Sequence, residues 1–301
     1  MGLTVGVIGL GRIGAQWELD KLRQKPSTHL GGWIRVPEVE KITICDVDLN
    51  RGFDVAKQFV TNPLSGEPLN LENLPPNVMY EREFDIVSVA TPAKTHKDVV
   101  ANLMVNPPKL IFVEKPIATN LEDAKWMVDA CAEHKVKLCV NHTRRWHPIW
   151  QRVVETLKAG QARPTMAVGH FSGDMLNTGI HMADLLNWYG IGSVAEVFGH
   201  RDAEYLLFEL DIFFPRERLT VRDNGFRADY YMAEASDHYE GITELKPVEE
   251  PKIYTPDLPS PMEVACHDLA HNVYDDTQPA CTGEMGLAAL QRALEWERKA
   301  T

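Results

Sequence analysis

The stretch that decides the fold is Leu3–Gly14, LTVGVIGLGRIG. Its first half, Leu3–Ile8, is a short apolar run typical of a buried strand, and the pattern GLGRIG at Gly9–Gly14 follows at once. We expect the loop to open a helix that runs through Leu22. A strand, a glycine-rich turn and a helix in this order predict a Rossmann domain that binds a dinucleotide.

Each loop glycine has its own task in such a domain. Gly9 allows the tight turn, Gly11 lets backbone N–H groups approach a pyrophosphate, and Gly14 lets helix and strand pack closely. The pyrophosphate would then lie at the N-terminus of the helix, against the backbone of Arg12 and Ile13.

A second strand, Lys41–Cys45, ends in an acidic residue, Asp46. A carboxylate there accepts hydrogen bonds from the two ribose hydroxyls of an adenosine and repels a 2′-phosphate, so we expect NAD rather than NADP. The segment 24–40, QKPSTHLGGWIRVPEVE, lengthens the usual spacing between glycine loop and acid. It forms either a wall of the active-site mouth or a plain surface loop.

Strands and helices alternate through the rest of the first half, which predicts a doubly wound parallel sheet. Residues 61–77 hold four prolines and are expected to be irregular. The expected elements are a strand at Phe84–Ala90, a helix ending at Met104, a strand at Leu110–Val113, a helix at Asn120–His134 with a capping box of Thr119 and Glu122, and a strand at Val136–Asn141.

The strand Leu110–Val113 ends abruptly in Glu114, Lys115 and Pro116. Ligands of an open α/β sheet bind outside the carboxyl ends of its strands, so this charged pair is a candidate for chemistry. The alternative at this point is a surface ion pair that caps the strand.

The pattern changes near residue 146 and predicts a second, α+β domain with a mostly antiparallel open sheet. We therefore expect a dinucleotide-binding domain at 1–145 and a substrate and oligomerisation domain at 146–301. The expected elements are helices at Pro148–Lys158, Thr178–Tyr189, within Ser260–Asp275 (with Ser260 and Glu263 at its capped start) and at Gly283–Lys299 near the domain junction, and strands at Thr165–Phe171, Val194–His200, Tyr205–Phe214, Leu219–Arg222 and Phe226–Ala233.

Three polar residues share one face of the helix expected at Thr178–Tyr189. Asn177, His181 and Asp184 have the spacing i, i+4 and i+7. A histidine on such a helix is either catalytic or a structural residue satisfied by hydrogen bonds, and the two polar neighbours in register favour catalysis.

Five motifs together resemble the Gfo/Idh/MocA family (glucose-fructose oxidoreductase, inositol dehydrogenase and MocA) over nearly the whole chain. This family comprises NAD(P)-dependent oxidoreductases that act mainly on sugars and cyclitols. The motifs are GLGRIG, TPAKTH at Thr91–His96, EKP at Glu114–Pro116, RRWHP at Arg144–Pro148 and GIHMAD at Gly179–Asp184.

The resemblance implies that Lys115 and His181 are catalytic and that the Lys115–Pro116 bond is cis. His181 would act as general base on a secondary alcohol and Lys115 would stabilise the developing alkoxide, although in some members the lysine transfers the proton. Asn177, Asp184 and Arg145 are expected to bind the substrate; for Arg145 a structural ion pair is the equal alternative. Thr91, Pro92, His96, Glu114 and Lys115 join the glycine loop and Asp46 in the predicted cofactor site, and Glu114 would help to orient either the lysine or the cofactor.

Two departures from the family stand out. Many relatives have an aspartate where this chain has Asn177, which weakens an assignment as an inositol dehydrogenase. Only residues 201–204 separate two expected strands of the outer sheet, through which relatives form dimers or tetramers. A homo-oligomer remains the expectation. Two alternative functions are a sugar lyase or glycosidase that uses tightly bound NAD transiently, and a non-catalytic dinucleotide sensor.

Composition bounds the remaining possibilities. The 301 residues carry 43 acidic and 31 basic side chains, a net charge of −12, which disfavours nucleic acid as a partner. We expect neither a membrane segment nor a targeting peptide, and hence a cytoplasmic protein whose substrate is a small polyol or sugar. The five scattered cysteines predict reduced, mainly buried thiols, and His267 with His271 lacks a third metal ligand, so no metal site is predicted.

Overall fold

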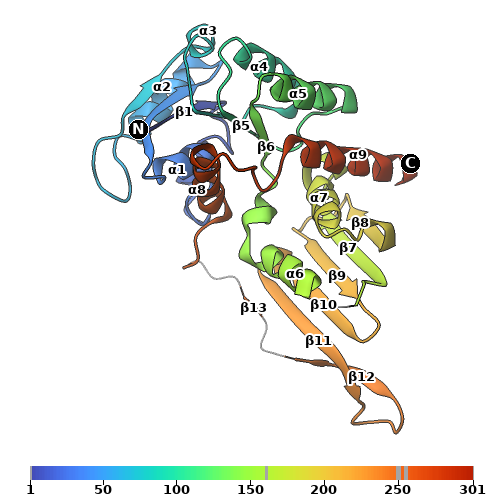
Figure 1. Cartoon of the computed structure of the whole chain (residues 1–301). Helices are drawn as coiled ribbons and strands as arrows, with labels where there is room; N and C mark the ends of the chain where they lie inside the picture. The colour runs from blue at the N-terminus through green and yellow to red at the C-terminus, as the bar shows by residue number, and fades with distance from the viewer. Residues whose placement is uncertain (1, 160–161, 249–251, 254–256, 301) are drawn as a thin grey trace. The chain divides into compact units, whose positions relative to one another are not determined.

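The computed structural model describes residues 2–159, 162–248, 252–253 and 257–300. The chain divides into two compact units. The first contains residues 1–146 and 259–290, and the second contains 147–258 and 291–301. The colours of Figure 1 follow the chain through both of them.

A six-stranded parallel sheet forms the centre of the first unit, as predicted. Its strand order is β3-β2-β1-β4-β5-β6, so that the direction of winding reverses between β1 and β4. Strands β4 and β5 are buried along their whole length, and β1 and the second half of β2 nearly so, because helices pack on the sheet. The strands are β1 (Leu3–Ile8), β2 (Val39–Cys45), β3 (Leu71–Asn73), β4 (Ile86–Val89), β5 (Leu110–Val113) and β6 (Lys137–Val140).

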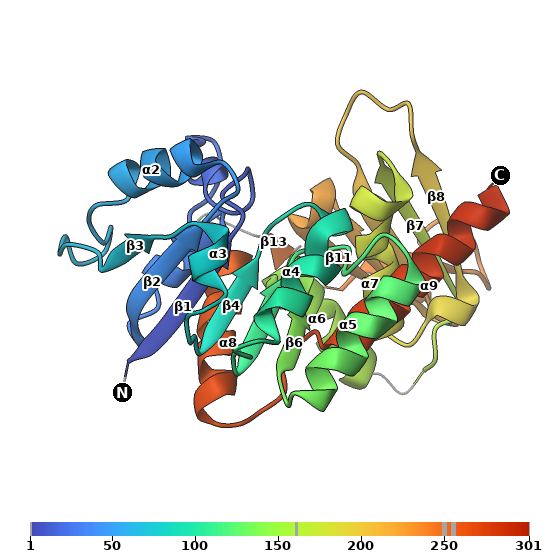
Figure 2. The same cartoon turned by 90° about the horizontal axis from the view of Figure 1, so that it is seen from above.

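The helices of this unit connect the strands or cover the sheet. Figures 1 and 2 show α4 beside α5, and α1 packs on α8. Asn120 caps α5 by accepting from the Asp123 amide, so the predicted capping box of Thr119 and Glu122 is wrong; the predicted Ser260 cap of α8 is confirmed. The helices are α1 (His29–Ile34), α2 (Leu49–Gln58), α3 (Pro76–Met79), α4 (His96–Leu103), α5 (Leu121–Glu133) and α8 (Pro261–Tyr274).

The helix predicted through Leu22 does not form. The chain leaves the glycine loop in a short 3-10 turn, Gln16–Leu19, and the carbonyls of Ile13 and Gly14 accept from the amides of His29 and Leu30 instead. Helix α1 thus continues the first turn after the chain has left it over residues 15–28, a segment that we call the excursion. In a continuous helix these two carbonyls would accept from the amides of Trp17 and Glu18, which instead donate to the carbonyls of Arg12 and Ala15.

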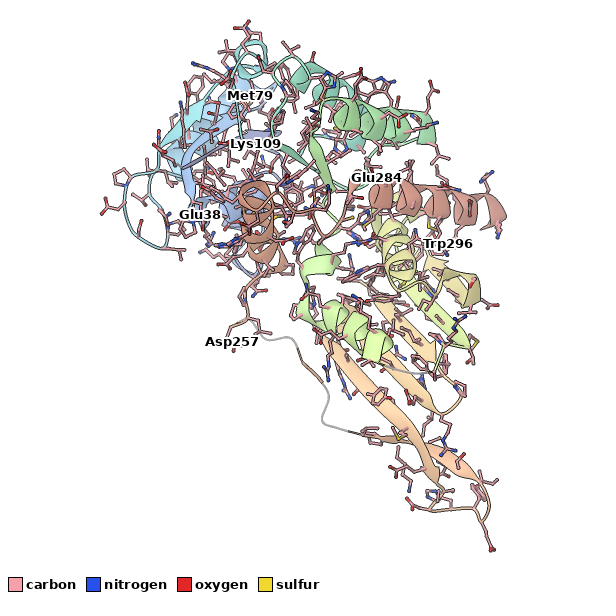
Figure 3. All side chains as sticks on the ribbon, in the orientation of Figure 1. Glu38, Met79, Lys109, Asp257, Glu284 and Trp296 are labelled. Atoms are coloured by element: carbon pink, nitrogen blue, oxygen red, sulfur yellow. The ribbon has the colours of Figure 1, made fainter. Side chains whose placement is uncertain are left out.

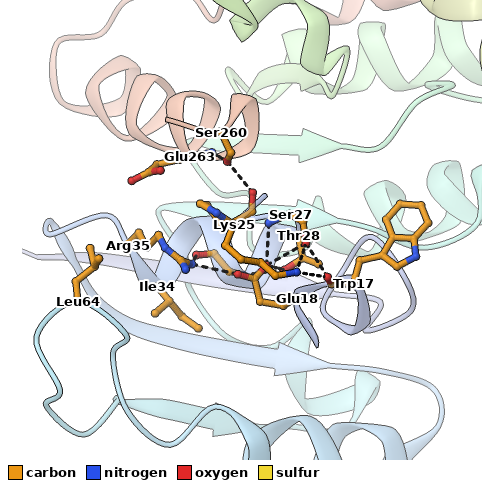
Figure 4. Close-up of polar contacts among 12 residues, drawn as sticks. Trp17, Glu18, Lys25, Ser27, Thr28, Ile34, Arg35, Leu64, Ser260 and Glu263 are labelled. Atoms are coloured by element: carbon orange, nitrogen blue, oxygen red, sulfur yellow. Dashed lines mark hydrogen bonds and ion pairs between the residues drawn. The ribbon is translucent and has the colours of Figure 1, made fainter. Parts of the chain in front are cut away.

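Side chains hold the excursion closed, as Figure 4 shows. The Lys25 ammonium donates to the carbonyls of Trp17 and Asp20, at 2.7 Å each. The Glu18 carboxylate accepts from the Ser27 amide at 2.9 Å and the Thr28 hydroxyl at 3.0 Å. These contacts satisfy backbone groups that a continuous helix would have paired internally.

The second unit is built on a sheet with the strand order β12-β11-β10-β9-β7-β8, in which β13 pairs with β11. Only the β7–β8 pair is parallel among these described strands, so the prediction of a mostly antiparallel sheet is confirmed. The sequence did not predict β12 and β13. The strands are β7 (Met166–Ser172), β8 (Ala195–His200), β9 (Phe208–Phe213), β10 (Glu217–Arg222), β11 (Arg227–Ala235), β12 (Thr243–Pro247) and β13 (Lys252–Ile253).

One face of this sheet forms the core of the second unit. Trp150, Phe171, Leu185, Phe208 and Leu210 are among its buried residues. Three helices complete the chain: α6 (Pro148–Ala159), α7 (Ile180–Trp188) and α9 (Gly283–Ala300). The outer part of the β11–β12 hairpin projects beyond the other strands of its sheet (Figure 3).

The five cysteines are buried free thiols, as predicted. Burial raises the pKa of the Cys45 and Cys131 thiols to about 12. No helix in the described part of the chain has the length and apolar character needed to cross a membrane.

Candidate cofactor and catalytic site

The glycine loop joins β1 to the first turn, at the point where the sheet reverses its winding. Gly9 has a φ of +92°, and a Cβ on it would lie 2.8 Å from the backbone of Ala90 and Thr91. A Cβ on Gly14 would lie 1.9 Å from the Gly9 carbonyl oxygen. A Cβ on Gly11 would meet nothing within 4 Å. The fold itself therefore requires Gly9 and Gly14, whereas Gly11 keeps open the space that a ligand would fill.

The loop also offers consecutive backbone donors. In the described part of the chain, the amides of Gly11, Arg12 and Ile13 donate no hydrogen bond to another backbone group. Successive N–H groups of this kind form an anion-binding nest, which fits a pyrophosphate. Because no long helix begins here, the predicted contribution of a helix N-terminus is wrong, and the backbone amides of the loop are the donors that a pyrophosphate would meet.

Asp46 lies at the end of β2 and is 5% exposed. Its carboxylate accepts from the amides of Leu10 at 2.7 Å and Asp48 at 2.9 Å. The Arg51 guanidinium lies 3.0 and 3.1 Å from its two oxygens. Arg51 was missed by the sequence analysis, although its place in the first turn of α2 was a usable signal.

The loop Thr91–His96 follows β4 and is tied to the segment after Lys115. The His96 ring nitrogens lie 2.8 Å from the Thr91 carbonyl oxygen and 3.1 Å from that of Ile117. Burial lowers the pKa of His96, although the two carbonyl oxygens act in the opposite direction. His96 thus links two segments of the predicted cofactor site; Pro92 is exposed beside it.

Glu114 is 6% exposed, so it is not half of a surface ion pair. Its Oε1 lies 3.0 Å from His29 Nε2 and accepts from the Asn141 amide, and its Oε2 accepts from the Lys115 backbone N–H at 3.1 Å. Burial alone would raise the pKa of this carboxyl. The hydrogen bond and charge of His29, the charge of Lys115 and the hydrogen bond of Asn141 lower the pKa by more than burial raises it, so that it lies below its ordinary value. Lys115 is half-buried, and the Lys115–Pro116 bond is cis, as the resemblance implied.

Arg145 is buried in the first unit, at 2% exposed. Its guanidinium donates to the Ala280 carbonyl at 2.8 Å and contacts the Met285 sulfur at 3.3 Å. These contacts support the structural alternative, and the substrate contact of Arg145 stays a prediction.

The second unit holds the other candidates. Helix α7 begins at Ile180, and a π-helical turn, Met175–Gly179, precedes it. Asn177 is exposed on this turn, whereas His181 is 8% and Asp184 1% exposed. The π-helical turn alters the regular α-helical spacing assumed for Asn177, but His181 and Asp184 both lie in α7.

The Phe208 ring packs edge-on against the His181 imidazole, with 6.5 Å between the ring centroids. Among the residues that the structure describes, no group of three or more His, Cys, Asp or Glu side chains could hold a metal ion.

Similarity to known proteins supports the Rossmann fold of the first unit. Residues 3–142 match the model of the Gfo/Idh/MocA family, described as an oxidoreductase family with an NAD-binding Rossmann fold. The match covers the Rossmann part of this chain, which is similar to that family.

Two curated relatives show the range of reactions that similar chains carry out. A scyllo-inositol 2-dehydrogenase (NAD(+)) of Bacillus subtilis is 24% identical over 209 residues, which cover 64% of this chain and 56% of the relative. A 2,7-anhydro-N-acetylneuraminate hydratase of Escherichia coli is 29% identical over 158 residues, covering 52% of this chain and 36% of that protein. The chain therefore matches little more than half the length of the dehydrogenase and about a third of the length of the hydratase.

The whole fold is similar to that of a UDP-N-acetylglucosamine 3-dehydrogenase from Acidithiobacillus ferrooxidans. The TM-score is 0.75 at 18% identity, and the match covers 98% of this chain and 96% of that one. Similarity at this identity concerns the fold, and it extends beyond the Rossmann part to the second unit.

Proposed function

We propose that the protein is an NAD-dependent oxidoreductase that transfers a hydride between nicotinamide and a secondary alcohol of a sugar, sugar acid or cyclitol. The observation that carries this proposal is the buried Glu114 beside the backbone of Lys115, at the carboxyl end of β5 in an NAD-binding Rossmann domain. A buried carboxylate at the end of a strand does not by itself stabilise a sheet, because moving a charge out of water costs free energy. Its presence here therefore favours a functional role.

The residues of the first unit suit the cofactor. The Gly11–Ile13 amides would hold the pyrophosphate, and Asp46 would accept from the ribose hydroxyls. When bound, the nicotinamide ring accepts or donates a hydride at its C4 atom. NAD is favoured over NADP, because a 2′-phosphate would lie close to the Asp46 carboxylate.

Lys115 and His181 would divide the work on the alcohol. The Lys115 ammonium stabilises negative charge as it develops on the carbinol oxygen. The His181 imidazole accepts the hydroxyl proton, since an imidazole titrates in a range that suits a general base. Asn177 and Asp184 would bind further hydroxyl groups of the substrate; the amide of Asn177 can both donate and accept.

The substrate class rests on the relatives. Both dehydrogenases named above act on polyhydroxylated rings, an inositol and a nucleotide sugar. The similarity to a hydratase keeps the transient use of NAD as the second candidate function.

The proposal is tested by NADH and NADPH formation with scyllo-inositol, D-glucose, D-gluconate and UDP-N-acetylglucosamine. We expect turnover with NAD on at least one of them, and loss of that turnover in Lys115→Ala with cofactor affinity retained. Cofactor binding without turnover on any of them would contradict the dehydrogenase proposal and favour the other candidates.

A further inference from the structure

A chain of buried hydrogen bonds links helix α1 to the backbone of Lys115. The Trp33 indole donates to Ser88 Oγ at 2.7 Å, and Ser88 Oγ lies 3.1 Å from His29 Nδ1. His29 Nε2 lies 3.0 Å from Glu114 Oε1, and Glu114 Oε2 accepts from the Lys115 amide at 3.1 Å. Trp33, Ser88 and His29 are fully buried.

The chemistry of its two ends sets the direction of this chain. An indole nitrogen only donates, and an ionised carboxylate only accepts. His29 Nε2 therefore carries a hydrogen, whatever the state of Nδ1. Asn141 gives the same carboxylate oxygen a second donor from the end of β6. Glu114 is thus held by two side chains and in turn holds one backbone group, that of Lys115.

His29 reaches this place only because α1 resumes after the excursion. The backbone bond from the His29 amide to the Ile13 carbonyl sets the helix on the end of the glycine loop, and Thr28 caps it. The His29 ring also packs on Phe112 of β5, at 4.7 Å between centroids. The ring is therefore fixed both by packing and by hydrogen bonds.

We propose that His29 is a positioning residue, which acts through Glu114 to hold Lys115 in place for the reaction. This inference rests on the proposed catalytic role of Lys115. A lysine that must stabilise a single oxygen needs a fixed backbone, since a displacement of about 1 Å at a reacting centre can lower the rate by about a hundredfold.

The two amides that mimic an imidazole separate the contacts of His29. In His29→Asn the amide takes the place of Nδ1, so it can reach Ser88 but not Glu114. In His29→Gln the amide takes the place of Nε2 and can still donate to Glu114. Leu30→Ala is the matched control, because Leu30 is fully buried on the same helix and makes no polar side-chain contact.

Hydrogen exchange of the Lys115 amide tests the proposal without any substrate. We expect His29→Asn to speed this exchange at least tenfold, His29→Gln to stay within a few fold of the parent, and Leu30→Ala to lower the melting temperature without this selective change. Unchanged exchange in His29→Asn would overturn the proposal, whatever the enzyme's reaction is.

Turnover on whichever of the four compounds above is oxidised fastest completes the test. We expect His29→Asn to lower kcat about tenfold to a hundredfold with little change in NAD affinity, and His29→Gln to restore it. In a Lys115→Ala background, His29→Asn should cause no further loss, because both act on one group. An equal further loss would show that His29 acts independently of Lys115. Full activity of Lys115→Ala would instead refute the proposed function.

Discussion

Replacing Asp46 with serine should change the choice between NAD and NADP, and the structure gives the reason. The carboxylate is bonded on both oxygens to Arg51, at 3.0 and 3.1 Å. In the parent, the Asp46 carboxylate would repel a 2′-phosphate, and the Arg51 guanidinium is already paired with that carboxylate. In Asp46→Ser the repulsion disappears, and Arg51 becomes available to pair with the phosphate.

The magnitude follows from these charges. Two unit charges about 4 Å apart near a protein surface interact by about 4 kcal/mol, and solvent reduces this for a partly exposed side chain such as Arg51. We therefore expect the ratio of NADP affinity to NAD affinity to rise by about tenfold to a hundredfold, where about 1.4 kcal/mol corresponds to tenfold. NAD affinity itself should fall, because the Leu10 amide loses its acceptor.

Fluorescence titration of both cofactors measures this ratio without a substrate. Asp54→Ser is the control, since Asp54 is an exposed acid on the same helix α2 that pairs with Lys57 and not with Arg51. Adding Arg51→Ala to Asp46→Ser should remove the part of the gain in NADP affinity that comes from pairing with Arg51. An unchanged ratio in Asp46→Ser would refute the reasoning and show that another group reads the ribose.

Three further outcomes are expected. Gly14→Ala should abolish NAD binding and lower the melting temperature, because its Cβ would lie 1.9 Å from the Gly9 oxygen, whereas Gly11→Ala should weaken NAD binding at an unchanged melting temperature. The pKa of Glu114 is lowered in the folded chain, so the ionised carboxylate adds to the free energy of unfolding at a pH above the ordinary pKa of 4.5, and this contribution is lost as the pH falls below 4.5. Acid titration should therefore show a smaller loss of stability in Glu114→Gln than in the parent. Lys115→Ala should lower kcat about a hundredfold or more and leave the Kd for NADH nearly unchanged; equal turnover would remove Lys115 from the mechanism.

Much of the fold could be predicted from local patterns. Short apolar runs such as Leu110–Val113 are fully buried strands, and their alternation with helices correctly predicted a parallel sheet. The interruption of the helix after the glycine loop could not be predicted. This interruption depends on contacts between residues far apart in the sequence, such as the bond from Ser260 Oγ to the Pro26 carbonyl, two residues 234 positions apart.

The candidate site divides in the same way. Asp46, Glu114 and Lys115 stand directly after strands, where a sequence pattern can find them. His29 lies 85 positions from Glu114, within a segment that has the composition of a loop, so nothing local marked it. Asn141 was read as the end of a strand, and its role as a donor to Glu114 depends on the pairing of β5 with β6.

The amount of NADH formed per substrate molecule consumed tests the central claim most directly. The oxidised product should be counted by mass spectrometry alongside NADH, on whichever of the four compounds is converted. The account predicts about one NADH per molecule of a ketone product that is two hydrogens lighter than its substrate. Conversion of substrate with no net NADH would contradict it and would establish the transient use of NAD instead.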